Sequence, residues 1–252
     1  MRFKTRLNPK IWDRFQEKRI GGKITYHLKS EVLAKLRQIS KEFITFLKIP
    51  HIAVKDIRIT GSCVNYNYTR YSDLDLHIIV DYNLIHNKCP LVENYLWALK
   101  QIFNKDHDIK IYGIPVELYA ENSKIEGVSN GVFSIKDNKW LKEPEKTKIT
   151  VDDSAVKIKA NEYIEAIDKC SDEESAQKLL DKIYVMRRSG LALAGEFSTE
   201  NLVFKVLRNA KVIEKLRKII KKDLDAQLTL EALALDVKER FNTISEMFVN
   251  KS

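Results

Sequence analysis

Cysteine is scarce in this 252-residue chain, and long apolar runs are absent. Cys63, Cys89 and Cys170 are an odd number, lie far apart and form no C-x-x-C pair, so we expect neither a disulfide framework nor a thiolate metal site. No window approaches about eighteen consecutive apolar residues, and no apolar segment follows the basic N-terminus. We therefore expect no membrane span, no secretory signal and a reducing, cytoplasmic compartment. Internal repeats and low-complexity stretches are also absent.

The net charge of +9 is concentrated at the start of the chain. Residues 1–48 carry 13 Lys and Arg against 4 Asp and Glu, whereas residues 49–150 and 151–252 are each balanced. A basic segment of this kind is a candidate surface for phosphate or RNA, with Lys4 and Arg6 as candidate contacts. The alternative is a solvated helix face preceded by a loose basic tail.

A second basic region spans residues 187–222, with ten Lys and Arg against three acidic residues. It is a further candidate for RNA binding, through Arg187, Arg188, Lys218 and Lys222. An ordinary amphipathic helix explains the same pattern, because Leu216, Ile219 and Ile220 then face inward. The charge pattern leaves both interpretations open.

Hydrophobic periodicity predicts mixed α and β structure over residues 1–150. We expect helices at 29–48 and 91–103, strands at 55–60, 73–82 and 114–122, and a hairpin at 130–144. In the second helix, the expected inward stripe is Leu91, Tyr95, Leu96, Leu99 and Ile102.

From residue 152 onward only helical patterns follow. They cover roughly 154–168, 173–189, 199–209, 211–222 and 229–249, with Ser198 or Thr199 as an N-cap. The chain is thus predicted to be α+β, with a mixed sheet and flanking helices in residues 1–150 and an all-helical domain in residues 151–252.

Asp73 and Asp75 alternate with Leu74 and Leu76 in the second predicted strand. Side chains of a strand point alternately to opposite faces, so the leucines can be buried while both aspartates face a cleft. Carboxylates so placed can bind cations about 3.5–4 Å apart, and without a cation they repel each other. A solvated strand face paired with Lys and Arg is the alternative.

A Gly-Ser pair precedes the aspartates. Gly61 and Ser62 follow the first predicted strand, where glycine lets the backbone approach a phosphate and the serine hydroxyl can donate to it. A helix beginning there would add to the phosphate site. Arg70, in the same loop, is a further candidate phosphate contact or a solvated arginine.

A third carboxylate would complete a metal site. Glu117 has apolar neighbours in its strand and is the favoured candidate, whereas Asp106 and Asp108 lie in a turn-like setting and are the alternatives. His77 shares the aspartate face and is a candidate ligand, although local packing also explains it.

The order Gly61-Ser62, Asp73-Leu74-Asp75-Leu76 and Val116-Glu117-Leu118 resembles the nucleotidyltransferase superfamily of the DNA polymerase β type. Thr69 and Ser72 match members that make oligoadenylates and cyclic nucleotides. The N-terminal LNPKIWD and the later RRSGLALAGEFSTENLVFKVLRN are similar to uncharacterised predicted nucleotidyltransferases of tailed phages, a resemblance that names no substrate and places the chain in a bacterial or phage-infected cell.

This resemblance implies a mechanism and a set of site residues. Asp73 and Asp75 would bind two Mg²⁺ ions, and Glu117 would complete the site that activates an acceptor hydroxyl. Gly61, Ser62, Thr69, Arg70 and Ser72 would bind the nucleotide. The reaction would transfer a nucleoside monophosphate from an NTP to an acceptor, expected to be RNA, with release of pyrophosphate. The alternatives are a second-messenger synthase and an inactive module that binds RNA or nucleotide.

Overall fold

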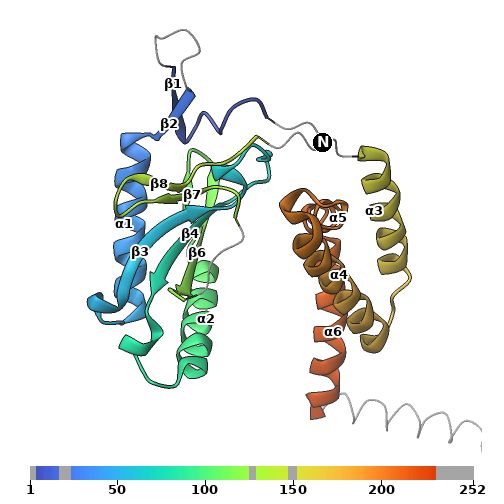
Figure 1. The fold of residues 1–252 in the computed structure, drawn as a ribbon. Helices are drawn as coiled ribbons and strands as arrows, with labels where there is room; N and C mark the ends of the chain where they lie inside the picture. The colour runs from blue at the N-terminus through green and yellow to red at the C-terminus, as the bar shows by residue number, and fades with distance from the viewer. Residues whose placement is uncertain (1–3, 17–23, 125–128, 147–151, 231–252) are drawn as a thin grey trace, which may run out of the picture. The chain divides into compact units, whose positions relative to one another are not determined.

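The computed structural model describes residues 4–16, 24–124, 129–146 and 152–230. The chain divides into two compact units, Met1–Lys148 and Ile149–Ser252, each with a hydrophobic core of its own. The first unit mixes strands and helices, and the described part of the second is helical (Figure 1). The predicted α+β class is confirmed. Within the described ranges, no helix is long and apolar enough to cross a membrane.

A six-stranded mixed sheet forms the centre of the first unit, with the strand order β5-β6-β4-β3-β7-β8. The strands are β3 (Val54–Thr60), β4 (Leu74–Val80), β5 (Lys110–Ile111), β6 (Ile114–Asn122), β7 (Val132–Ser134) and β8 (Lys139–Lys142). β4 and β6 run parallel, and the other neighbours are antiparallel. The predicted hairpin is β7–β8, and Asn138 in its turn has a positive φ of 52°. The parallel pair is central to the site, because it places β6 directly beside β4.

Two helices, α1 (Ser30–Leu47) and α2 (Cys89–Asp106), pack on the sheet and on each other. In α1, the residues buried at helical spacing include Val32, Leu36, Ile39, Phe43 and Leu47. In α2 the predicted stripe was only partly right: Leu96 is buried and Leu99 half-buried, but Leu91, Tyr95 and Ile102 are exposed. Val92 and Phe103, which were not predicted, are also buried. Apolar residues occur on both sides of this helix, so its sequence is compatible with more than one inward face.

The basic N-terminal segment is not a loose tail over its described residues. Two strands, β1 (Trp12–Gln16) and β2 (Ile24–Leu28), pair antiparallel. Leu7, Ile11 and Trp12 are almost completely buried, and Trp12 stacks on Trp140 with ring centroids 4.6 Å apart. Only Trp12 is buried within β1, so this strand lacks the alternation that would have predicted it.

The second unit contains α3 (Asp153–Asp168), α4 (Glu173–Ala194), α5 (Thr199–Asn209) and α6 (Val212–Leu228). Asp152, Asp172 and Ser198 cap the first three, each accepting hydrogen bonds from backbone N–H groups of the first turn. Ser198 is thus the N-cap of α5. The predicted helix at 229–249 lies outside the described residues, apart from its first two positions.

Candidate functional site

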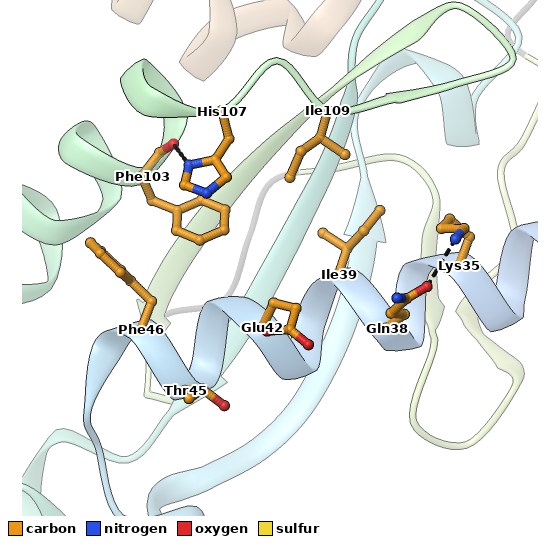
Figure 2. Close-up of a pocket in the computed structure, with 9 residues that line it drawn as sticks. All are labelled: Lys35, Gln38, Ile39, Glu42, Thr45, Phe46, Phe103, His107 and Ile109. Atoms are coloured by element: carbon orange, nitrogen blue, oxygen red, sulfur yellow. Dashed lines mark hydrogen bonds between the residues drawn. The ribbon is translucent and has the colours of Figure 1, made fainter.

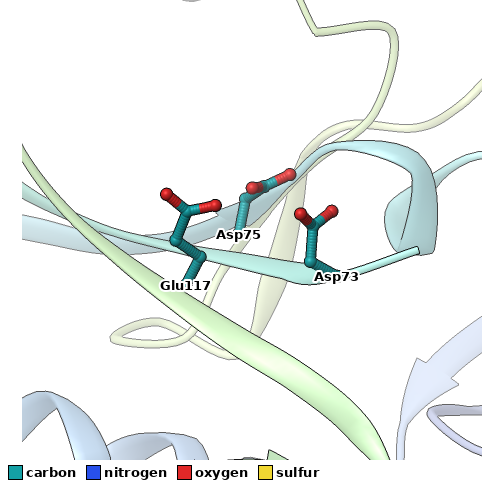
Figure 3. Close-up of side chains that lie close together, drawn as sticks. All are labelled: Asp73, Asp75 and Glu117. Carbon is teal, nitrogen blue, oxygen red and sulfur yellow. The ribbon is translucent and has the colours of Figure 1, made fainter. Parts of the chain in front are cut away.

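Three carboxylates converge at the ends of β4 and β6. Asp73 immediately precedes β4, Asp75 lies within it, and the parallel register places Glu117 beside Asp75. One ligand oxygen from each lies within 4.8 Å of the others, and all three side chains are half-buried. Figure 3 shows the three carboxyl groups turned toward a common space. The structure thus brings together the three residues predicted to form a metal site.

The alternation along the strands explains this convergence. Leu74, Leu76 and Leu118 are almost completely buried on the opposite face of the sheet. Since side chains alternate, burial of the leucines directs Asp75 and Glu117 to the other face. The apolar residues therefore determine the direction of the acidic ones.

The turn at Gly61 lies directly against Asp75. Gly61 has a φ of +77°, and a Cβ at this position would lie 1.9 Å from Oδ2 of Asp75. Only glycine accommodates both this backbone conformation and so close a carboxylate. The Gly-Ser turn and the carboxylates consequently form one site.

The loop after Gly61 is closed by hydroxyl groups. Ser62 Oγ donates to Ser72 Oγ at 2.7 Å, and the backbone N–H of Thr69 donates to the same oxygen at 2.9 Å. Ser72 is buried. A single 3₁₀ turn, Ser62–Val64, follows the glycine, so the structure has no α-helix N-terminus there. These contacts give Thr69 and Ser72 a part in holding the loop.

The N-terminal segment supports this loop. The indole of Trp12 donates to the carbonyl oxygen of Cys63 at 2.9 Å, and the N–H of Lys4 donates to that of Tyr66 at 2.8 Å. The ammonium group of Lys4 lies 5.8 Å from the centre of the Tyr68 ring. Lys4, predicted as an RNA contact, is therefore next to the loop that follows the Gly-Ser pair.

Helix α2 contributes two side chains that the sequence did not reveal. Lys100 Nζ lies 2.9 Å from Oε1 of Glu117. Asn104 makes two hydrogen bonds to Leu118, accepting from its N–H at 3.0 Å and donating to its carbonyl at 2.9 Å. The Asn104 amide thus provides hydrogen bonds to the backbone N–H and C=O of Leu118, the residue after Glu117 in β6.

Asn104→Ala is expected to destabilise the protein by about 1–3 kcal/mol, because it leaves a half-buried N–H and C=O of β6 without their partners. Chemical denaturation measures this loss. Gln101→Ala, at an exposed position of the same helix, is the control and should change stability by less than ~0.5 kcal/mol. Equal effects of the two substitutions would contradict the role given to Asn104.

Two residues after Asp75 and Glu117 in their strands, His77 and Tyr119 stack with ring centroids 4.7 Å apart. His77 Nε2 lies 3.0 Å from Thr60 Oγ1, and its Nδ1 lies 3.1 Å from Oε2 of Glu121. Burial raises the pKa of the Tyr119 hydroxyl, and the charges of Asp75 and Glu117 raise it further. His77 shares the acidic face as predicted, but its contacts are with Thr60, Tyr119 and Glu121, and it is not part of the carboxylate cluster.

Three other residues predicted as metal or phosphate contacts, Asp106, Asp108 and Arg70, either lie outside the carboxylate cluster or contact other side chains. Asp108 is exposed and pairs with Lys110. Neither it nor Asp106 belongs to the cluster of carboxylates that could hold a metal ion among the described residues. The Arg70 guanidinium lies 4.6 Å from the centre of the Tyr71 ring. Glu117, rather than either alternative aspartate, supplies the third carboxylate.

The candidate RNA-binding residues of the helical unit differ in their exposure to solvent. The Arg187 guanidinium packs 4.2 Å from the centre of the Phe204 ring, while Arg188, Lys218 and Lys222 are exposed. Leu216 is fully buried and Ile219 and Ile220 are partly buried, as the amphipathic interpretation of α6 requires. The exposed cations remain candidates for RNA binding.

The donor set fits a small divalent cation. Carboxylate oxygens are the protein ligands that Mg²⁺ prefers, and three such groups at this spacing repel each other unless a cation compensates them. The negative charge of the carboxylates also acts on the neighbouring loop. Burial, together with the charges of Asp73 and Asp75, raises the pKa of the Cys63 thiol to about 12. Asp73, Asp75 and Glu117 are the residues that would hold the ion.

A separate groove of about 500 Å³ lies between α1 and the C-terminal end of α2 (Figure 2). Its lining includes Ile39, Phe46, Phe103 and His107. None of the predicted site residues lines it.

No protein-family model matches the chain, and no curated protein matches it. Among solved structures, it is similar to the STING-associated CdnE c-di-GMP synthase from Capnocytophaga granulosa, with a TM-score of 0.22 and 14% identity. The match covers 78% of this chain and 83% of that chain. At this TM-score, the likeness does not bear on the function of the chain.

Proposed function

We propose that this protein is a Mg²⁺-dependent nucleotidyltransferase, which transfers a nucleoside monophosphate from an NTP to an acceptor hydroxyl. The observation that carries the proposal is the convergence of Asp73, Asp75 and Glu117 within 4.8 Å, directly against the Gly61 turn. The same three elements, in the same order, make up the sequence pattern of the superfamily that the chain resembles. In this proposal residues 1–150 form the catalytic domain and residues 151–252 a helical domain.

Each residue has a defined part in the proposed reaction. Bound Mg²⁺ would lower the pKa of the acceptor hydroxyl and neutralise charge on the phosphates. Asp73 and Asp75 would hold the metal, and Glu117 would complete the site together with Asp75. The acceptor hydroxyl gives its proton to the Glu117 carboxylate, and its oxygen forms a bond to the α-phosphorus. The bond from that phosphorus to the bridging oxygen breaks, and pyrophosphate leaves.

The Gly-Ser turn is proposed to position the triphosphate. The glycine admits close approach of a phosphate to the backbone, and the Ser62 hydroxyl can turn from Ser72 to a phosphate oxygen. Lys4 and Arg6, both exposed on the segment that lies along this loop, add positive charge nearby. RNA is the proposed acceptor, on the strength of these cations and the exposed ones of the helical unit.

A screen of all four NTPs with Mg²⁺ tests the proposal, with pyrophosphate release and transfer of an α-³²P label as readouts. Total RNA, tRNA and no acceptor are the arms of the screen. Labelled RNA supports the proposed acceptor, whereas a labelled small oligonucleotide without added acceptor identifies a second-messenger synthase. Binding of RNA or nucleotide with no pyrophosphate under any condition would show an inactive module and overturn the proposal.

A further inference from the structure

Lys100 is held at two points beside the carboxylate site. Its ammonium group lies 2.9 Å from Oε1 of Glu117 and 4.0 Å from the centre of the Tyr119 ring. The Lys100 side chain is only 14% exposed, against 37% for Glu117. A lysine that is this buried and contacts both an anion and an aromatic face has a defined position.

The position matters because of the charges around it. The carboxylates of Asp73, Asp75 and Glu117 are close enough to repel, and that repulsion favours either protonation or separation of the groups. The Lys100 ammonium compensates one of the three charges. A divalent cation bound by the carboxylates would then compete with Lys100 for Glu117, since two cations near one carboxylate repel each other.

The ammonium group of Lys100 has a second place available next to its position beside Glu117. A groove of about 340 Å³ between α2 and β6 is lined by Lys100, Trp97, Glu93 and Tyr119. Glu93 and Trp97 precede Lys100 on the same helix at spacings that share a face. The groove thus offers space, a carboxylate and an aromatic side chain to a lysine that leaves Glu117.

We propose that Lys100 is a positioning residue that serves as a tethered counter-cation, holding Glu117 in the site before metal binds and moving into the α2–β6 groove when a divalent cation replaces it. This inference rests on the proposed function, because it requires the three carboxylates to bind a divalent ion. Lys100 competes with the divalent ion for Glu117 and so lowers the metal affinity of the site. When no metal is bound, Lys100 keeps Glu117 in place beside the two aspartates.

Mn²⁺ binding without nucleotide tests the inference, with free Mn²⁺ measured by electron paramagnetic resonance. Lys100→Met and Lys100→Gln remove the competing charge and are expected to lower the Kd for Mn²⁺ by about tenfold. Both variants should also melt at a lower temperature than the wild type in the absence of metal. Lys100→Arg, which keeps the charge, should bind Mn²⁺ within about twofold of the wild type.

Lys105→Met is the matched control, because Lys105 is an exposed lysine in the last turn of the same helix. It should leave both the Kd and the melting temperature unchanged. Unchanged or weaker Mn²⁺ binding by Lys100→Met and Lys100→Gln, beside normal binding by the wild type, overturns the role of Lys100 alone. If the wild type binds Mn²⁺ no better than Asp73→Asn, the metal site and the proposed function fail as well.

Discussion

Asp75→Asn is expected to reduce nucleotidyl transfer by at least about a thousandfold, equivalent to ~4 kcal/mol of transition-state stabilisation. Asp75 follows Asp73 by two residues in the chain and lies beside Glu117 in the register of β4 and β6. Asparagine keeps the shape of the side chain and removes its charge. The expected result is therefore loss of metal binding and of activity in a protein that is still folded.

Two measurements separate this loss from unfolding. Without metal, the melting temperature of Asp75→Asn should stay the same or rise, because the substitution reduces repulsion among the three carboxylates. With Mg²⁺, the wild type should gain stability by mass action and Asp75→Asn should not. Transfer activity close to that of the wild type in Asp75→Asn would show that the site has been assigned to the wrong residues.

Asp108→Asn is the matched control. Its carboxylate is 77% exposed, pairs with Lys110 and lies outside the acidic cluster. Asp108 was also an alternative third ligand in the sequence. Normal activity of this variant, beside an inactive Glu117→Gln, would settle which of the two carboxylates acts.

The alternation of Asp with Leu was enough to predict the direction of the site residues. Leu74 and Leu76 are fully buried, which leaves Asp75 on the opposite face of β4 as expected. Proximity of Glu117 did not follow from alternation, since nothing in the strand pattern states that β6 lies beside β4. Glu117 was favoured because its strand has a similar apolar setting, and the resemblance to a known sequence pattern supported that choice. The parallel register places Glu117 beside Asp75.

The contribution of α2 could not be predicted, because it depends on which face of the helix is buried. Leu96 is buried as expected, but Leu91, Tyr95 and Ile102 are exposed. Val92 and Phe103, which the expected stripe did not include, are buried. The observed orientation brings Lys100 to Glu117. Tertiary packing, rather than periodicity, selects between two apolar faces of similar strength.

Gly61→Ala is expected to impair stability and activity together. A Cβ at Gly61 would lie 1.9 Å from Oδ2 and 3.0 Å from Cγ of Asp75, so either the turn or the carboxylate must move. Alanine is also strained at the φ of 77° and ψ of −165° found here, a region essentially restricted to glycine, at a cost of about 1–3 kcal/mol. Displacement of a catalytic carboxylate by about 1 Å typically costs about a hundredfold in rate.

Gly113→Ala separates these two effects. Gly113 has nearly the same φ, +78°, but a Cβ there would meet no atom within 4 Å. This variant should therefore lose about 1–2 kcal/mol of stability from backbone strain alone and keep its metal affinity and transfer activity. A loss of metal affinity and transfer activity in Gly61→Ala that Gly113→Ala does not show then measures the effect of the contact with Asp75.

Denaturation curves, Mn²⁺ affinity and transfer rates of the two variants provide the comparison. Gly61→Ala should be the less stable of the two, should bind Mn²⁺ more weakly and should transfer at least about a hundredfold more slowly. Equal stability and equal activity of the two alanine variants would mean that Asp75 moves aside at no cost. In that case the close approach of the Gly-Ser turn to the carboxylates would not be a requirement of the site, and the glycine would serve only the turn.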